Sequence, residues 1–199
     1  MTTKTTTKKT TRAKTLKVNK PLPNLPRNPF IFEILDLVSK QRSKTKKVEV
    51  LKKYDEPSLR RVLIWNFDES IKSAVPEGEV PYVGYDDQNT YSGTLTTKLT
   101  HDIRAMHETG SFSLGASDQQ GHTTIRRESK HFYRFCKGGN DALNAIRRET
   151  MFINILEGLH PLEAEIVCLC KDKRLGEVYK VTQEIVAEAY PDIRWGNRS

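Results

Sequence analysis

Apolar residues recur at three- and four-residue spacing along most of the chain, which predicts amphipathic helices. Residues 30–38, 48–54 and 59–67 each show this pattern. Asn28 before the first segment and Thr45 before the second have side chains that are suitable helix caps. Because the connections between these segments are short, they predict an antiparallel helical array rather than a sheet.

The same spacing continues in the second half of the chain. It resumes at Thr124 and ends near Gly139, since glycine readily takes the left-handed conformation that closes a helix. Asn140 is expected to cap the longest helix, with Ile146 among its buried residues. Further helices follow, and Pro191 ends the last one. The chain shows no fixed repeat and no alternating strand pattern, so it predicts an all-α fold, a compact array of about six to eight short helices.

Composition divides the chain into three parts, the second of which contains an insertion. Residues 1–27 begin with threonine, lysine and arginine and end in a proline-rich spacer, which predicts a disordered basic arm. Residues 28–191 form the predicted helical domain. Within it, residues 83–123 predict a flexible insertion, because 76–92 contains proline, glycine, aspartate and tyrosine and 109–123 is rich in glycine, serine and glutamine, although 94–108 has helical spacing. Residues 192–199 form a short tail.

The positive charge of the chain is concentrated at its N-terminus. The net charge is +8, from 33 basic and 25 acidic residues. Residues 1–32 hold eight of the basic residues and no acidic one, which leaves 25 of each sign in the rest. A flexible polycation can neutralise nucleic-acid phosphates or an acidic protein surface. It can also be a solubilising tail, or an arm that threads into a neighbouring subunit. The candidate phosphate-binding residues of the arm are Lys4, Lys8, Lys9, Arg12, Lys14, Lys17 and Lys20.

Three turns in the body combine basic residues with predicted helix starts or glycines. The N-terminus of a helix presents unpaired N–H groups and a partial positive charge, and nearby lysines add to it. Glycine lets the backbone approach a phosphate closely. These turns are therefore candidate phosphate contacts, and their alternative interpretation is a solvated helix face. Their residues are Lys44, Thr45, Lys46, Lys47, Lys137, Gly138, Gly139, Asn140, Lys173, Arg174 and Gly176.

Several runs in the body have counterparts in a known family. They are Ile34-Leu35, Lys44-Thr45-Lys46-Lys47, Val50-Leu51-Lys52-Lys53, Ser58-Leu59-Arg60-Arg61-Val62-Leu63, Gly139-Asn140 before a long helix, and the 162–191 block with its Arg174-Leu175-Gly176 break. This order resembles the helical DNA-binding domain of phage-type ATP-dependent DNA ligases. Residues 1–27 and 83–123 have no counterpart. The resemblance implies a helical module that clasps duplex DNA by its backbone. The chain lacks the Lys-x-Asp-Gly motif of a ligase, so ligase activity is not implied.

The chain as a whole also resembles a family of small uncharacterised proteins from T-even-like and marine tailed phages. The runs that support this are Asn28-Pro29-Phe30-Ile31-Phe32-Glu33-Ile34-Leu35, Pro76-Glu77-Gly78 and Arg147-Arg148-Glu149. The resemblance implies a protein made in the host cytoplasm during infection, which can also enter the virus particle. No apolar run is long enough to cross a membrane, and the N-terminus does not have the pattern of a secretion signal.

Catalytic and metal-binding motifs are missing from the sequence. There is no Walker loop, nucleophile elbow or glycine-rich dinucleotide turn. No histidine or cysteine spacing matches a zinc site, and Cys168 and Cys170 are expected to be small buried residues. Asp86 and Asp87 fall in the predicted loop, while Glu163 and Glu165 are expected on an exposed helix face. The sequence therefore predicts a protein that is not an enzyme and needs no cofactor or metal.

These observations favour a non-catalytic phage protein that binds duplex DNA largely without sequence preference. It would contact the phosphate backbone through the three turns and the basic arm. The alternative is a virion or assembly component, or an adaptor, whose arm docks on an acidic protein. A further alternative is a regulator that binds phage or host replication or transcription proteins.

Overall fold

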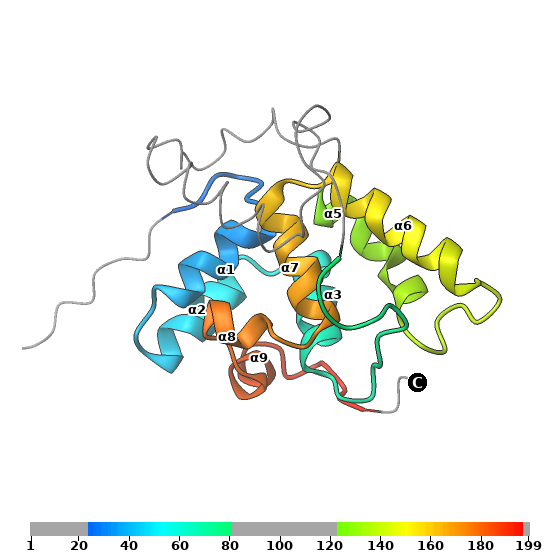
Figure 1. Ribbon diagram of the computed structural model, residues 1–199. Helices are drawn as coiled ribbons and strands as arrows, with labels where there is room; N and C mark the ends of the chain where they lie inside the picture. The colour runs from blue at the N-terminus through cyan, green and yellow to red at the C-terminus, as the bar shows by residue number, and fades with distance from the viewer. Residues whose placement is uncertain (1–23, 81–122, 197–199) are drawn as a thin grey trace, which may run out of the picture.

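The computed structural model describes residues 24–80 and 123–196, and Figure 1 shows how the helices are arranged. Within these ranges it contains eight α-helices, one 3-10 helix and, in place of strands, an isolated β-bridge. The predicted all-α array of six to eight short helices is thus confirmed for the described part. The basic arm up to residue 23 and the helical pattern at 94–108 lie outside the described residues. The helices are α1 (Ile31–Ser39), α2 (Lys44–Lys53), α3 (Pro57–Phe67), α5 (Ile125–Glu128), the 3-10 helix η3 (Ser129–Phe135), α6 (Ala145–Gly158), α7 (Pro161–Lys171), α8 (Leu175–Tyr179) and α9 (Gln183–Ala189).

The first two helices begin at residues other than the predicted ones. The backbone N–H of Phe30 donates to the Glu33 carboxylate at 2.9 Å, so an acid inside the first turn of α1 fixes its start. Asn28 lies outside the helix, and its prediction as the cap is wrong. Ser43 caps α2, because its hydroxyl accepts the backbone N–H of the third helical residue at 3.2 Å. Thr45 is already helical, so it is not the cap.

The longest described helix, α6, starts later than the sequence predicts. Its cap is Asn144, whose side chain accepts a backbone N–H at 2.8 Å, and the prediction of Asn140 is wrong. The Arg148 guanidinium binds the backbone carbonyls of Asn140 (2.9 Å) and Leu143 (3.0 Å). These carbonyls serve as acceptors for an arginine rather than for helical N–H groups, so residues 140–143 form a loop.

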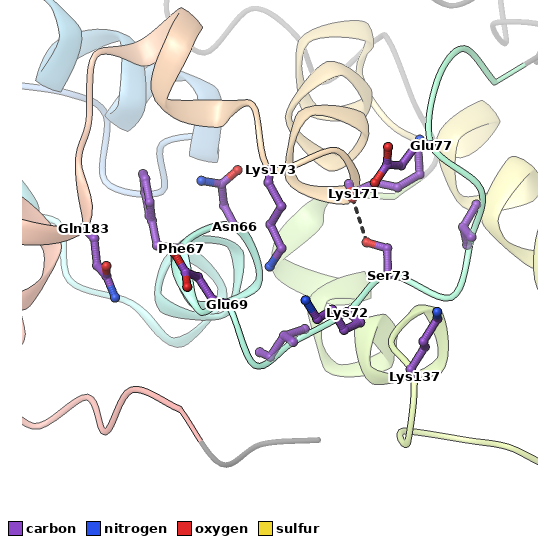
Figure 2. Close-up of a pocket in the computed structure, with 12 residues that line it drawn as sticks. Asn66, Phe67, Glu69, Lys72, Ser73, Glu77, Lys137, Lys171, Lys173 and Gln183 are labelled. Carbon is purple, nitrogen blue, oxygen red and sulfur yellow. Dashed lines mark hydrogen bonds between the residues drawn. The ribbon is translucent and has the colours of Figure 1, made fainter.

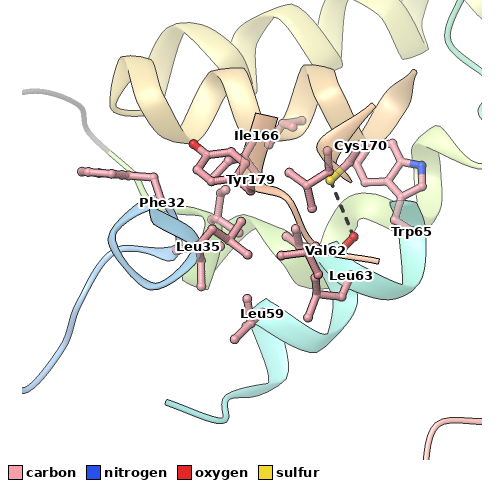
Figure 3. Packing of buried hydrophobic residues seen from close by; sticks show 14 of the residues in the cluster. Phe32, Leu35, Leu59, Val62, Leu63, Trp65, Ile166, Cys170 and Tyr179 are labelled. Atoms are coloured by element: carbon pink, nitrogen blue, oxygen red, sulfur yellow. Dashed lines mark hydrogen bonds between the residues drawn. The ribbon is translucent and has the colours of Figure 1, made fainter. Parts of the chain in front are cut away.

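The core is built around α7, which packs against α1, α3, α6 and α8. Figure 3 shows Leu35 of α1, Leu59 of α3 and Ile166 of α7 in one cluster of side chains, and all three are buried. The Cys170 thiol also lies against α3, 3.6 Å from the Val62 carbonyl oxygen. Because apolar residues occupy most positions of α7, this helix is surrounded by the others on nearly every side.

Helix α6 lies at the edge of the array away from α1 and α2 (Figure 1). Phe152 and Leu156, in its second half, are fully buried. Ile146, in its first turn, remains 79% exposed, so the prediction that it is buried is wrong. The apolar spacing is real, but among the described residues the buried apolar positions of the helix lie in its second half.

The C-terminal region divides into two helices, α8 and α9, which the sequence predicts as a turn followed by one helix. Lys180 separates them in the left-handed conformation, with φ of 53°. Helix α9 packs on α2, and the Tyr190 hydroxyl after it donates to the Leu51 carbonyl at 2.8 Å. None of the described helices is long and apolar enough to cross a membrane.

A buried carboxylate joins three helix starts. Glu163 in the first turn of α7 is 1% exposed, and its two oxygens accept the backbone N–H groups of Ile31 (3.3 Å) and Ile125 (2.8 Å). The prediction that Glu163 lies on an exposed face is wrong, because two other helix N-termini supply donors that make burial tolerable. Burial raises its pKa to about 7, against the opposing effect of the two N–H groups.

Candidate functional site

The turn at the start of α2 is largely used to hold the fold together. The Lys44 ammonium pairs with Glu188 at 3.1 Å and with Glu184 at 4.0 Å, both on α9. Lys47 donates to the backbone carbonyl of Lys180. Lys46 and Thr45 have no side-chain hydrogen bond within the described chain. Two of the three predicted lysines in this turn therefore have partners within the molecule.

The turn at residues 137–140 follows η3, and its glycines have a structural role. Gly138 has φ of 77°, a conformation that favours glycine. A Cβ on Gly139 would lie 1.9 Å from the Tyr133 carbonyl oxygen, so this position admits no side chain. Lys137 is exposed, and its ammonium has no hydrogen bond or ion pair to the described residues. The tight chain path explains the glycines, and the lysine remains available for a ligand.

The third turn, residues 173–176, is also tightly packed. The Lys173 ammonium donates to the backbone carbonyls of Trp65 and Asp68, the latter at 3.0 Å. Arg174 pairs with Glu177 at 2.9 Å on the surface. Gly176 is already inside α8, where a Cβ would lie 2.8 Å from a backbone carbonyl oxygen of the next segment. This glycine therefore serves helix packing rather than the approach of a ligand to the backbone.

Two of the three predicted turns meet at one pocket. Its volume is about 520 Å³. Figure 2 shows Lys173 reaching in from the end of α7, while Lys72 and Lys137 come from the segments after α3 and η3. The turn at Lys44 does not contribute to it. The complete lining is Asn66, Phe67, Glu69, Ile71, Lys72, Ser73, Val75, Glu77, Lys137, Lys171, Lys173 and Gln183.

A short antiparallel pairing places two of these lysines together. Ser73 and Cys136 form an antiparallel bridge, flanked by hydrogen bonds from Ala74 N–H to the Phe135 carbonyl (2.7 Å) and from Lys137 N–H to the Lys72 carbonyl (2.8 Å). Lys72 and Lys137 consequently lie opposite one another. Like charges in opposite positions destabilise a strand pair, and within the described chain neither ammonium has an acidic partner. An anion between them would remove this repulsion.

The fourth lysine supports the wall of the pocket. The side chain of Lys171 is fully buried, and its ammonium donates to the carbonyls of Pro76 (2.8 Å) and Gly78 (3.0 Å) and pairs with Asp172. The Ser73 hydroxyl in turn donates to the Lys171 carbonyl at 2.7 Å (Figure 2). These bonds tie residues 73–78 to the end of α7, so the pocket wall is fixed before any ligand arrives.

Burial makes the Lys173 ammonium easier to deprotonate. Its pKa is lowered, first by desolvation and further by the neighbouring charge of Lys72, while the charge of Asp68 opposes the change. The lining contains four lysines and two glutamates, Glu69 and Glu77, and because Lys171 pairs with Asp172, the excess left for a ligand is one positive charge. The pocket is therefore suited chemically to an anion.

Sequence reasoning found Lys137 and Lys173 but missed Lys72, Lys171 and Ser73. Lys72 lies in a connection of mixed charge, and its importance arises from pairing with a segment more than 60 residues away. No local pattern reports such a pairing. The run of apolar residues before Lys171 is a sequence signal that could have identified it, since a lysine at the end of a largely apolar helix needs a specific partner when it is buried.

Other candidate residues are involved in structural contacts. Phe132 and Phe135 are buried in the core. The Arg148 guanidinium binds backbone carbonyls of η3 and of the loop before α6.

Cys168 and Cys170 are buried as expected, and burial raises the pKa of both thiols far above the usual range. No group of three or more potential metal-ligating side chains occurs among residues 24–80 and 123–196. Asp86 and Asp87 lie outside the described residues.

The fold and the site define a small all-α protein with a lysine-lined pocket between the ends of α3, η3 and α7. Residues 34–119 and 110–177 match a family of unknown function, DUF6433. The chain belongs to this family. No curated protein and no solved structure matches it.

Proposed function

We propose that this protein binds duplex DNA without catalysis and largely without sequence preference, as a protein of a tailed phage. The observation that supports the proposal is the convergence of Lys137 and Lys173 with Lys72 at one pocket. The lysines of two turns that resemble a ligase DNA-binding domain thus lie on a common surface. Phosphate groups are the anions that such lysine clusters bind.

The proposed contact surface differs between the body and the arm. In the body it consists of Lys72, Lys137 and Lys173. Lys44 and Lys47 contribute less, because α8 and α9 already supply acceptors for their ammonium groups. The basic residues of the arm, from Lys4 to Lys20, add flexible contacts to the phosphate backbone.

The test measures duplex binding across a salt series with the full chain. Replacement of the seven basic arm residues by glutamine, and separately the K72Q/K137Q variant, removes one set of contacts at a time. Each lost phosphate contact lowers the slope of log affinity against log salt by about 0.9. The matched control is K40Q/K52Q, which removes two exposed lysines that do not line the pocket.

The result expected is a shallower slope for the arm variant and, by about two contacts, for K72Q/K137Q, with the control near the parent. Absence of duplex binding by the parent at low salt would refute the function. A loss confined to the arm variant would assign binding to the arm and leave the body as a scaffold.

A second candidate is an adaptor or assembly protein, and one observation favours it. Ile146 in the first turn of α6 is 79% exposed, and Tyr133 is 49% exposed. Exposed apolar side chains of this size are typical of protein contacts. In the adaptor interpretation the basic arm docks on an acidic protein surface. The salt series separates the two functions, because an adaptor shows no duplex binding.

A further inference from the structure

We infer that the lysine pocket takes a phosphate monoester, the group that ends a DNA strand or completes a free nucleotide. This inference rests on the proposed function and specifies which part of the nucleic acid the pocket binds. The attached nucleoside would lie toward Phe67 and Ile71, the partly exposed apolar residues of the lining.

The charge of the pocket fits a monoester better than an internal phosphate. A monoester carries between one and a half and two negative charges near neutral pH, whereas a diester carries one. Lys72 and Lys137 lie opposite one another in the backbone pairing, and neither has an acidic partner within the described chain. The Lys173 ammonium donates two of its three N–H groups to backbone carbonyls, which leaves one N–H group for a ligand. The charge of a monoester therefore matches this group of lysines better than the single charge of a diester.

The shape of the pocket leads to the same choice. A volume of about 520 Å³ lies within the range of sites that enclose small molecules. An uninterrupted duplex backbone runs past such a concavity, because its neighbouring phosphates prevent a single one from entering deeply. A strand end or a free nucleotide has no such restriction.

The pocket is also preorganised, since the buried Lys171 ammonium and the Ser73 hydroxyl fix its wall. A rigid wall reduces the entropy lost when a ligand binds. Glu69 and Glu77 lie in the same lining and repel an anion. Neutralising either of them should therefore strengthen binding, which is the opposite effect from neutralising a lysine.

The experiment compares labelled hairpin duplexes of one sequence that end in a 5′-phosphate, a 3′-phosphate or hydroxyl groups only. Anisotropy titrations of the full chain at fixed salt give the ratio of affinities. One charge-assisted site should favour at least one phosphorylated end by about tenfold. K72Q/K137Q should reduce the ratio to one, E69Q/E77Q should increase it, and K40Q/K52Q should leave it unchanged.

Two further arms identify the source of the monoester. Deoxynucleoside 5′-monophosphate and inorganic phosphate are added as competitors against the phosphorylated duplex. If the nucleotide displaces the phosphorylated duplex at micromolar concentration, the result supports a monoester site and indicates that its ligand is a free nucleotide. If displacement of the duplex needs a far higher nucleotide concentration, the result also supports a monoester site and indicates that its ligand is the phosphorylated end of a strand.

Equal affinity for all three ends, with no displacement by either competitor, overturns the inference while duplex binding itself stands. If none of the duplexes binds to the full chain, the proposed function is refuted as well. A phosphate preference that survives K72Q/K137Q places the monoester site elsewhere and also overturns the inference.

Discussion

Folding shifts the pKa values of His160 and Glu163, at the start of α7, in opposite directions. His160 caps the helix, with Nδ1 accepting the Leu162 N–H at 3.2 Å, and its ring stacks on Phe32 at 4.9 Å between centroids. Burial lowers its pKa from 6.5 to about 4. Burial raises the pKa of Glu163 from 4.5 to about 7, although two backbone N–H groups oppose the change. Both residues are almost fully buried.

The signs follow from which state holds the proton. Between pH 4.5 and 7 the folded chain keeps a proton on Glu163 that the unfolded chain loses, so the free energy of unfolding falls as pH rises, by about 3 kcal/mol in total. Between pH 4 and 6.5 the unfolded chain gains a proton on His160 that the folded chain refuses. This effect raises the free energy of unfolding with pH by a similar amount, about 3 kcal/mol. The two contributions cancel over most of their common range.

Two single variants should reveal each contribution. H160N keeps a side chain that caps helices, and E163Q keeps one acceptor oxygen, so both should fold. Relative to the parent, E163Q gains about 3 kcal/mol between pH 4.5 and 7, on top of a constant loss from one unpaired N–H group. H160N gains a similar amount as pH falls from 6.5 to 4. Urea denaturation at half-unit steps of pH gives these differences.

A flat difference profile for E163Q would show that the carboxylate is ionised throughout this range. The two N–H donors would then outweigh burial, and the reasoning on Glu163 would be wrong. A flat profile for H160N would refute the pKa reasoning on His160 alone, because the two differences are measured independently.

Three further predictions concern packing and are checked by thermal or urea denaturation. G139A should destabilise the fold by about 2 kcal/mol or more, since its Cβ would lie 1.9 Å from a carbonyl oxygen, and retained stability would show that the turn relaxes. K171M should cost about 3 kcal/mol, because it leaves the Asp172 carboxylate without its buried partner, and an unchanged midpoint would contradict the buried ion pair. I146S should change stability by less than about 0.5 kcal/mol, whereas F152A should cost about 3 to 5 kcal/mol, and equal losses would show that the start of α6 packs on something.

Helices whose limits depend on local signals could be predicted from the sequence. Pro57 and Pro161 occupy the first positions of α3 and α7, where the missing N–H costs nothing. The limit at Asn140 could not be predicted, because Arg148 from the following helix takes the carbonyls of that loop. Burial of Glu163 depends on the starts of two helices that lie 38 and 132 residues away in the chain. Spacing along one segment contains no information about either contact.

Only some of the residues of the candidate site could be predicted from the sequence. Basic residues at turns indicated Lys137 and Lys173, because their composition is visible in one window of sequence. The same rule also selected Lys44, and it could not reveal that Glu188 would neutralise that lysine. Lys72 required knowledge of the bridge between Ser73 and Cys136. Charge composition thus identifies lysines that can bind an anion, whereas tertiary pairing decides which of them are free to do so.

The position of Lys72 and Lys137 distinguishes an anion site from ordinary surface charge. A surface lysine usually extends into water or pairs with an acid, as Lys40 does with Asp36 at 2.6 Å. These two lie opposite each other over a pocket whose wall is held by the buried Lys171. Without a ligand the arrangement is repulsive, so K72Q should leave the folded protein as stable as the parent or slightly more so. With a bound phosphate the order should reverse. That reversal, measured as the shift in melting temperature on adding a deoxynucleoside monophosphate, is what purely structural lysines would not produce.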